Sequence, residues 1–294
     1  MKNKIKLGMP TLIEKPKINE CIALCKRLEL DFIEINMNLP HYQVDNIDAN
    51  EILKLSADNA IFFTIHLDEN LNVCDFNKDV ANAYLNTVLQ TIDYSKILNI
   101  PILNIHMHPG IYFTLPDRKV YLFDEYKDHY FDKLKHFRDV CTKAIGDTGI
   151  KICIENTDGY KDFMQEGIKI LLESDVFALT WDIGHDHGSK NVDTDFILEN
   201  ADRVIHMHIH DAYGTKNHLV LGSGEINLTE KINFAREHGI KTVFYQAEAG
   251  SKQARAFAEN IDGEDRMLEP LSPDYIDNLR RIAEAIVIPG GKTE

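Results

Sequence analysis

Histidine side chains are concentrated at the ends of short apolar runs in this sequence. Nine of the 13 histidines take such positions: His66, His106, His108, His185, His187, His206, His208, His210 and His218. Imidazole is the commonest metal ligand in proteins, and it titrates near neutral pH. Histidines that end several separate strands therefore predict one polar cavity, built from distant parts of the chain, that could bind a metal ion or move protons.

The densest of these runs spans Val204–Asp211 and reads VIHMHIHD. Successive side chains of a strand point to opposite faces, so the three histidines share one face while Met207 and Ile209 share the other. The run therefore predicts a strand that lines a polar site with one face and packs into a core with the other.

Two carboxylates occupy the same kind of position. Glu155 ends one apolar run, Asp182 ends the next, and His208 belongs to the run after that. Two carboxylates and an imidazole from neighbouring strands make a mixed oxygen and nitrogen site, which suits zinc, manganese, cobalt or ferrous iron. Cys153 shares the face of Glu155 but lies deeper, so we expect it to pack in the core.

The elements that must position these residues alternate regularly along the chain. Eight apolar runs are predicted strands: Ile5–Met9, Phe32–Met37, Ile61–His66, Ile102–His106, Lys151–Glu155, Phe177–Asp182, Val204–His210 and Thr242–Gln246. Segments with helical apolar spacing accompany them: Lys17–Leu30, Ala49–Ala57, Asp79–Leu98, Phe131–Ile145, Phe163–Leu172, Val192–Asn200, Leu228–His238 and Pro273–Ala285. This alternation predicts a single closed (β/α)₈ barrel over residues 1–294. A doubly wound open sheet is the alternative, but its glycine-rich phosphate loop is missing after the first strand.

The chemistry-bearing residues share one end of the predicted strands. At or near the carboxyl ends lie His66, His106, Glu155, Asp182, His208 and Gln246. Active sites of (β/α)₈ barrels form at that end, so the placement predicts an active site there.

Two segments are longer than a minimal barrel needs. Residues 107–127, after the fourth strand, contain aromatic residues beside Arg118 and Lys119, which suits a lid over an anionic or hydroxylated ligand. An ordinary surface loop is the alternative. Residues 250–269, after the eighth strand, form a charged segment.

Composition limits the partners and the compartment. The net charge of −15 and the pI near 5.3 disfavour nucleic acid, although a cluster of divalent metals would reverse the field locally. No apolar stretch approaches the roughly 20 residues of a membrane span, and the N-terminus lacks the apolar core of a signal peptide. Five cysteines in apolar runs are typical of a reduced cytoplasmic protein. The sequence leaves open whether the chain forms homo-oligomers.

Several short motifs resemble one known superfamily. These are LNIH ending at His106, IENTDG around Glu155, WDIGH around Asp182, MHIHD around His208 and LGSGEIN from Leu221. Together they resemble the xylose-isomerase-like TIM barrels, which join sugar isomerases and epimerases with the bacterial-type abasic-site endonucleases (AP endonuclease family 2). The resemblance runs from Gly8 to about Gln246.

The epimerase branch implies one metal ion held by Glu155, Asp182, His208 and a glutamate that ends the eighth strand. Two glutamates would then move a proton on either side of an enediolate, and His185 would contact the substrate. The eighth strand carries Gln246 instead, and an amide cannot act as a base. Glu248 either replaces that base through a bulge or leaves a one-base enzyme that uses Glu155.

The endonuclease branch implies three zinc ions. His66, His106 and a bridging Glu155 would hold the first ion, and the ligands named for the epimerase would hold the second. His185, His218 and an aspartate would hold the third, but Lys216 stands at the aspartate position. The lysine would leave this third position empty or fill it with its own ammonium group.

The sequence thus predicts a divalent-metal-dependent isomerase or epimerase that acts on a sugar or sugar phosphate, with manganese, zinc or cobalt in one or more sites. A zinc-dependent phosphodiester hydrolase and a catalytically impaired metal- or sugar-binding barrel are the alternatives. Glu34 could contact a substrate hydroxyl or form a structural ion pair, and His218 is a further substrate contact. Trp181 could form a wall for the sugar or pack outward, and His210 with Asp211 could orient His208.

Overall fold

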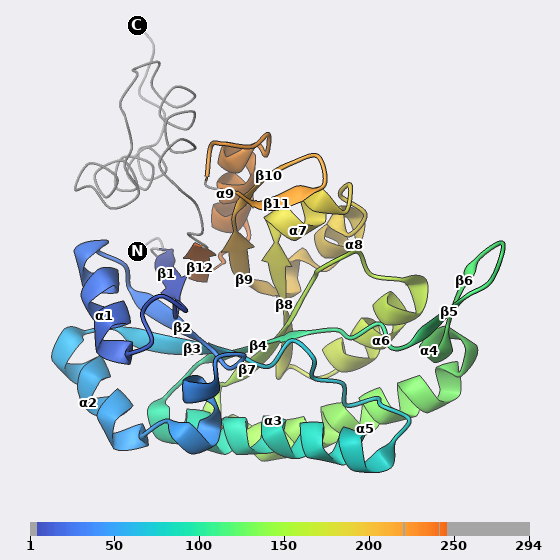
Figure 1. Cartoon of the computed structure of the whole chain (residues 1–294), viewed down its shortest axis with the longest axis horizontal. Helices are drawn as coiled ribbons and strands as arrows, with labels where there is room; N and C mark the ends of the chain where they lie inside the picture. Colours follow the sequence, from blue (N-terminus) through green and yellow to red (C-terminus); the bar gives the residue numbers. More distant parts are fainter. Residues whose placement is uncertain (1–4, 220, 241, 246–294) are drawn as a thin grey trace, which may run out of the picture.

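The computed structural model describes residues 5–219, 221–240 and 242–245, and it contains a closed barrel of parallel strands in the order β1-β12-β9-β8-β7-β4-β3-β2 (Figure 1). The barrel strands are β1 Lys6–Pro10, β2 Phe32–Asn36, β3 Phe62–His66, β4 Ile102–His106, β7 Lys151–Glu155, β8 Phe177–Asp182, β9 Val204–Ile209 and β12 Thr242–Tyr245. Each matches a predicted strand to within one or two residues at its ends. The predicted (β/α)₈ architecture is confirmed.

Helices cover the outside of this barrel. They are α1 Ile18–Arg27, α2 Ala49–Asn59, α3 Lys78–Leu98, α5 Lys127–Ile145, α6 Asp162–Leu172, α8 Thr194–Glu199 and α9 Leu228–Glu237. Local signals set their ends: Asn77 caps the first turn of α3 with its side chain, and Asn99 ends that helix in the left-handed conformation. The predicted helix Pro273–Ala285 and the charged segment 250–269 lie outside the described residues. Within the described ranges, no helix is both long enough and apolar enough to cross a membrane.

Each strand has an apolar outer face and a largely polar inner face. The outward residues, such as Ile33, Leu103 and Ile154, belong to the main hydrophobic core between strands and helices. The inward positions two residues apart form layers along the barrel axis. All five cysteines are buried and none forms a disulfide, which confirms that Cys153 packs in the interior.

The amino-terminal end of the barrel is filled by rings. Phe32 stacks on Phe62 with ring centroids 5.0 Å apart, and the ring of His206 lies 6.0 Å from that of Phe32. Gly8 passes so close that an added Cβ would lie 2.4 Å from the Phe32 ring. A glycine at this position therefore lets β1 close the barrel beside the two rings.

Two hairpins interrupt the regular alternation. Residues 107–127 contain the strands β5 Tyr112–Thr114 and β6 Lys119–Tyr121 and the short helix α4 Leu122–Glu125, and Figure 1 shows this hairpin projecting above α4 at the right edge of the view. Arg118 pairs with Asp117 at 2.9 Å, and Lys119 Nζ lies 4.3 Å from the ring centroid of Tyr112. These two cations thus lie on the exposed hairpin, engaged with its own side chains. The second hairpin joins β10 Asp211–Tyr213 to β11 Lys216–Leu219.

A buried polar network fastens the segment that follows β8. Trp181 packs outward, with its ring edge-on to Phe234 at 4.9 Å, and its Nε1 donates to Asp186 Oδ2 at 3.1 Å. Asp186 in turn accepts the backbone N–H of Asp193 at 3.1 Å. Asp193 accepts the backbone N–H of Tyr160 at 2.7 Å. Of the two alternatives for Trp181, the structure therefore shows the outward one.

Asp193 predicts a pH dependence of stability. Burial raises its pKa from 3.8 to about 6, and Asp186 adds to the increase, although the N–H of Tyr160 opposes it. The folded state then binds the proton more tightly than the unfolded state does. This contribution to stability is present below about pH 4 and is lost as the pH rises through 6. We expect Asp193→Asn, which keeps the acceptor oxygen, to be more stable than the wild type at pH 7 by about 2–3 kcal/mol.

Urea unfolding at a series of pH values measures this difference. The gap between variant and wild type should open between pH 4 and 6. Asp195→Asn, at an exposed position in the first turn of α8, is the matched control and should not gain stability at pH 7, because it removes a negative charge from the start of a helix. A gap that stays constant from pH 4 to 7 would contradict the assignment.

Candidate active site

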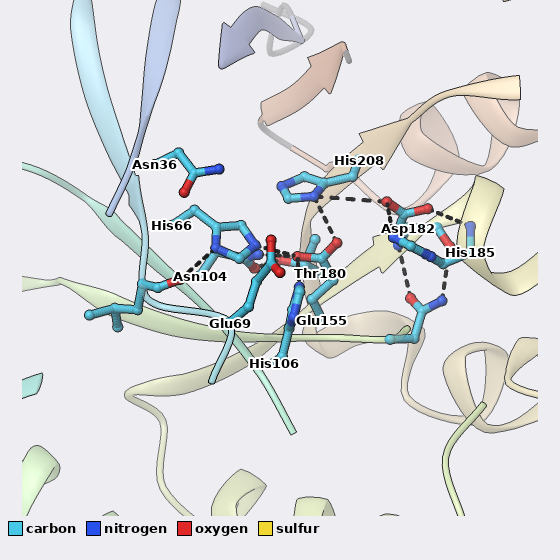
Figure 2. A network of polar contacts seen from close by, with 12 residues as sticks. Asn36, His66, Glu69, Asn104, His106, Glu155, Thr180, Asp182, His185 and His208 are labelled. Carbon is cyan, nitrogen blue, oxygen red and sulfur yellow. Dashed lines mark hydrogen bonds and ion pairs between the residues drawn. The ribbon is translucent and has the colours of Figure 1, made fainter. Parts of the chain in front are cut away.

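Five of the predicted metal ligands meet at the carboxyl end of the barrel. His66 ends β3, His106 ends β4, Glu155 ends β7, Asp182 ends β8 and His208 lies near the end of β9. Figure 2 shows their side chains pointing toward one another from these separate strands. The parallel register places His106 beside Glu155 and Asp182 beside His208. Gln246 and Glu248 lie outside the described residues.

Glu155 lies at the centre of this arrangement, and its side chain is buried. Its Oε1 lies 2.9 Å from Nδ1 of His208. Its Oε2 lies 3.2 Å from Nε2 of His66 and 3.4 Å from Nε2 of His106. One oxygen of the Glu155 carboxylate therefore faces His208, and the other faces His66 and His106 (Figure 2).

These residues form two groups that could each hold a metal ion. One group is His66, His106 and Glu155, and the other is Glu155, Asp182 and His208; the ligand atoms of each lie within 4.8 Å of one another. Carboxylate oxygen and imidazole nitrogen suit zinc, manganese and cobalt, and no thiolate takes part. The donor set thus fits the divalent ion that the sequence predicts. His108, which shares a strand face with His106, is not a member of either group, and its Nδ1 accepts the N–H of Gly110 at 3.0 Å.

The electrostatics of the site also favour a cation. Burial alone would raise the pKa of Glu155, but the charges of His208 and His106 hold it well below its ordinary range. Burial alone would lower the pKa of His208, but Glu155 and Glu34 raise it well above its ordinary value. Buried carboxylates here require positive charge beside them, and a divalent ion supplies more of it than one protonated imidazole does.

Backbone and side-chain donors orient Asp182. It caps the helix α7 Ile183–Gly188, and its Oδ1 accepts the N–H of His185 at 2.7 Å. Nε2 of His210 lies 3.0 Å from the same oxygen and forms its hydrogen bond with Oδ2, at 3.1 Å. Asn156 exchanges two hydrogen bonds with the main chain of Asp182, at 2.8 and 2.9 Å. The same Oδ2 lies 3.9 Å from Nδ1 of His208.

A third group consists of imidazoles alone. His185, His210 and His218 bring ligand nitrogens within 4.8 Å of one another, and the rings of His210 and His218 stack at 4.3 Å. Lys216, at the position where the endonuclease resemblance implies an aspartate, is exposed at the start of β11. His210 takes part in its place.

His210 contacts Asp182 rather than His208, which corrects its expected supporting role. Its Nδ1 accepts the N–H of His218 at 2.9 Å, so its proton lies on Nε2 and points to Asp182. Asp211 also has a different role from the one expected. Its carboxylate accepts the N–H groups of Gly222 at 2.7 Å and Gly224 at 2.9 Å, and so fastens the loop before α9.

Glu34 forms the ion pair that was one of its two alternatives. Its side chain is 1% exposed, and its oxygens lie 3.3 Å from Nε2 of His206 and 3.0 Å from Nε2 of His208. The hydroxyl of Thr64 donates to it at 2.8 Å. Glu34 therefore lies beneath the ligands, inside the barrel.

Two further residues of the site were missed in the sequence. Asn104 donates from Nδ2 to Oε2 of Glu155, and Thr180 donates to Oδ1 of Asn104 at 2.6 Å. Each lies two positions before a predicted ligand, His106 or Asp182, and so points to the same inner face. The alternation of side chains along the strand could have identified these two residues. Their residue types could not, because a short polar side chain in an apolar run indicates no particular chemistry.

Comparison with known proteins agrees with this architecture. Over 206 residues the chain is 25% identical to an uncharacterized protein of Methanocaldococcus jannaschii, in an alignment that spans 68% of this chain and 77% of that protein. Among solved structures, a D-tagatose 3-epimerase-like protein superposes with a TM-score of 0.70 at 19% identity, covering 96% of this chain and 98% of the other. The 3-keto-D-glucoside 4-epimerase YcjR of E. coli superposes with a TM-score of 0.67 at 18% identity, covering 96% and 100%.

A zinc-containing IolI structure is similar as well, with a TM-score of 0.64 at 14% identity and coverage of 96% and 98%. At these identities the structural likenesses establish the fold. The sequence itself matches the family described as xylose isomerase-like TIM barrel over residues 22–271, and the chain belongs to that family.

Proposed function

We propose that this protein is a divalent-metal-dependent isomerase or epimerase of sugars or sugar phosphates. The observation that carries the proposal is the group of Glu155, Asp182 and His208, which three neighbouring strands bring within 4.8 Å at the carboxyl end of the barrel. The sugar epimerases among the structures with the same fold support this substrate class.

Different residues of the site have different roles in the proposed proton transfer. A divalent ion bound there would polarise the carbonyl and hydroxyl oxygens of a sugar and so acidify the proton on the carbon between them. Glu155 is ionised in the folded protein and is the base that accepts this proton, with an enediolate as the intermediate. His185, whose side chain is 18% exposed, is the candidate to contact the substrate, with His218 beside it. Glu248 is the candidate for a second base.

A second function is favoured by one specific observation. His66 and His106 face the other oxygen of Glu155 and complete a second group of ligands. Two ions bridged by one carboxylate are typical of phosphoester hydrolysis. The net charge of −15 disfavours a nucleic-acid substrate for such an enzyme.

The number of bound ions separates the two functions. We expect elemental analysis of the metal-loaded protein to find about one manganese, cobalt or zinc ion per chain, held by the group that contains Asp182. The variant His66→Ala/His106→Ala should then keep that ion. Two or more zinc ions per chain, reduced by one in this variant, would contradict the isomerase and support the hydrolase.

Loss of the base should abolish proton transfer. Deuterium exchange from solvent into a panel of ketoses, followed by NMR, should occur with the wild type and fall by about 10²–10⁴-fold in Glu155→Gln. Glu166→Gln, at an exposed glutamate that pairs with Lys127, is the matched control and should retain full exchange. Metal content is measured for each variant, so that loss of the ion is distinguished from loss of the base. Absence of exchange with the wild type across the whole panel would refute the isomerase.

The eighth strand allows a separate test of the number of bases. Gln246→Glu restores the glutamate that the epimerase resemblance implies, and a one-base enzyme should gain at least about tenfold in exchange rate. If Glu248 already acts as the second base, Gln246→Glu changes little and Glu248→Gln reduces exchange instead. Equal rates for both variants and the wild type would exclude both roles.

A further inference from the structure

Glu34 lies one layer below the metal ligands, on β2, where a hydroxyl and two imidazoles converge on it. The hydroxyl of Thr64 donates to Oε2 at 2.8 Å, and Nε2 of His206 lies 3.3 Å from the same oxygen. Nε2 of His208 lies 3.0 Å from Oε1. An ionised carboxylate has only acceptor sites. The Glu34 carboxylate therefore favours a proton on each imidazole nitrogen that faces it.

His206 illustrates this arrangement within the same layer. With its Nε2 turned to Glu34, its Nδ1 lies 2.6 Å from the hydroxyl of Thr242. The hydroxyl also lies 3.3 Å from the carbonyl oxygen of Ile205; where it donates to the nearer Nδ1, the single proton of a neutral ring lies on Nε2. Burial lowers the pKa of His206, in agreement with a neutral ring. Glu34 thus selects one of the two tautomers of this histidine.

The same selection acts on His208, where it has a chemical consequence. Nδ1 of His208 lies 2.9 Å from Oε1 of Glu155 and 3.9 Å from Oδ2 of Asp182, at the position where a metal ion would be held. We infer that Glu34 is a positioning residue: it holds a proton on Nε2 of His208, so that the proton lost when a divalent ion binds between Glu155 and Asp182 is the one on Nδ1, whose lone pair then faces the ion. This inference rests on the metal dependence proposed above.

The geometry indicates what happens when the carboxylate becomes an amide. In Glu34→Gln, one oxygen and one NH₂ group replace two equivalent oxygens. The Oε2 position receives Thr64 and His206, so the amide oxygen takes that side. The NH₂ group then faces Nε2 of His208, which must accept a hydrogen bond and carry its proton on Nδ1. The ring is the same size and lies in the same place, but it offers the metal no lone pair.

The test measures the tautomer and the affinity separately. Long-range ¹H–¹⁵N NMR of the zinc-loaded wild type, with His208 identified by the signals missing in His208→Asn, should show Nε2 protonated and Nδ1 bound to the ion. Zinc affinity, measured by competition with a chelator, should fall by about 10–100-fold in Glu34→Gln. Thr64→Val removes one neutral donor and leaves the charge of Glu34 in place, so its affinity should stay within a factor of about two.

Two results would overturn the role proposed for Glu34. A zinc-loaded wild type that binds the ion through Nε2 of His208 overturns the role of Glu34, and so does an unchanged affinity in a folded Glu34→Gln. The wild-type spectrum alone suffices where Glu34→Gln does not fold. A wild type that takes up no zinc, cobalt or manganese refutes the metal dependence itself, which separates failure of the proposed function from failure of this inference.

Discussion

The rest of the structure depends on negative charge placed inside a barrel. Glu34, Glu155 and Asp182 are all nearly inaccessible to water, and a buried carboxylate without a partner costs several kcal/mol. Every one of them has at least one imidazole within 3.3 Å. This requirement explains the many histidines on the strands. An imidazole ring fits inside the barrel and supplies either a positive charge or a hydrogen-bond donor to the carboxylate beside it.

The division of each strand into two faces makes this arrangement stable. Outward residues such as Ile33, Ile154 and Met207 join one continuous apolar core beneath the helices. That core provides the free energy of folding, so the interior of the barrel can be polar along most of its axis. Within the polar interior, Asn104 and Thr180 connect neighbouring strands and fix the orientation of Glu155. The fold therefore takes most of its stability from the outer core and holds the polar residues of the interior in fixed positions.

Much of the fold and of the candidate site could be predicted from the sequence. The two-residue alternation of side chains and the ends of the apolar runs specify both the barrel strands and the side chains at their carboxyl ends. His66, His106, Glu155, Asp182 and His208 meet as predicted for that reason. The partners of His210 could not be predicted, because the hairpin β10–β11 returns His218 onto its ring. The role of Glu34 was left open, since a glutamate at a strand end looks the same in a sequence whether it faces a substrate or two imidazoles.

The closed amino-terminal end has a kinetic consequence for the buried acids and bases. Since Phe32 and Phe62 fill that end, the described imidazoles differ in their contact with water along the axis: the side chain of His106 is 18% exposed, that of His208 4% and that of His206 0%. A proton that leaves the ring of His206 must pass the neighbouring side chains before it reaches solvent at the carboxyl end of the barrel. We therefore expect proton exchange with the solvent to slow layer by layer from His106 down to His206.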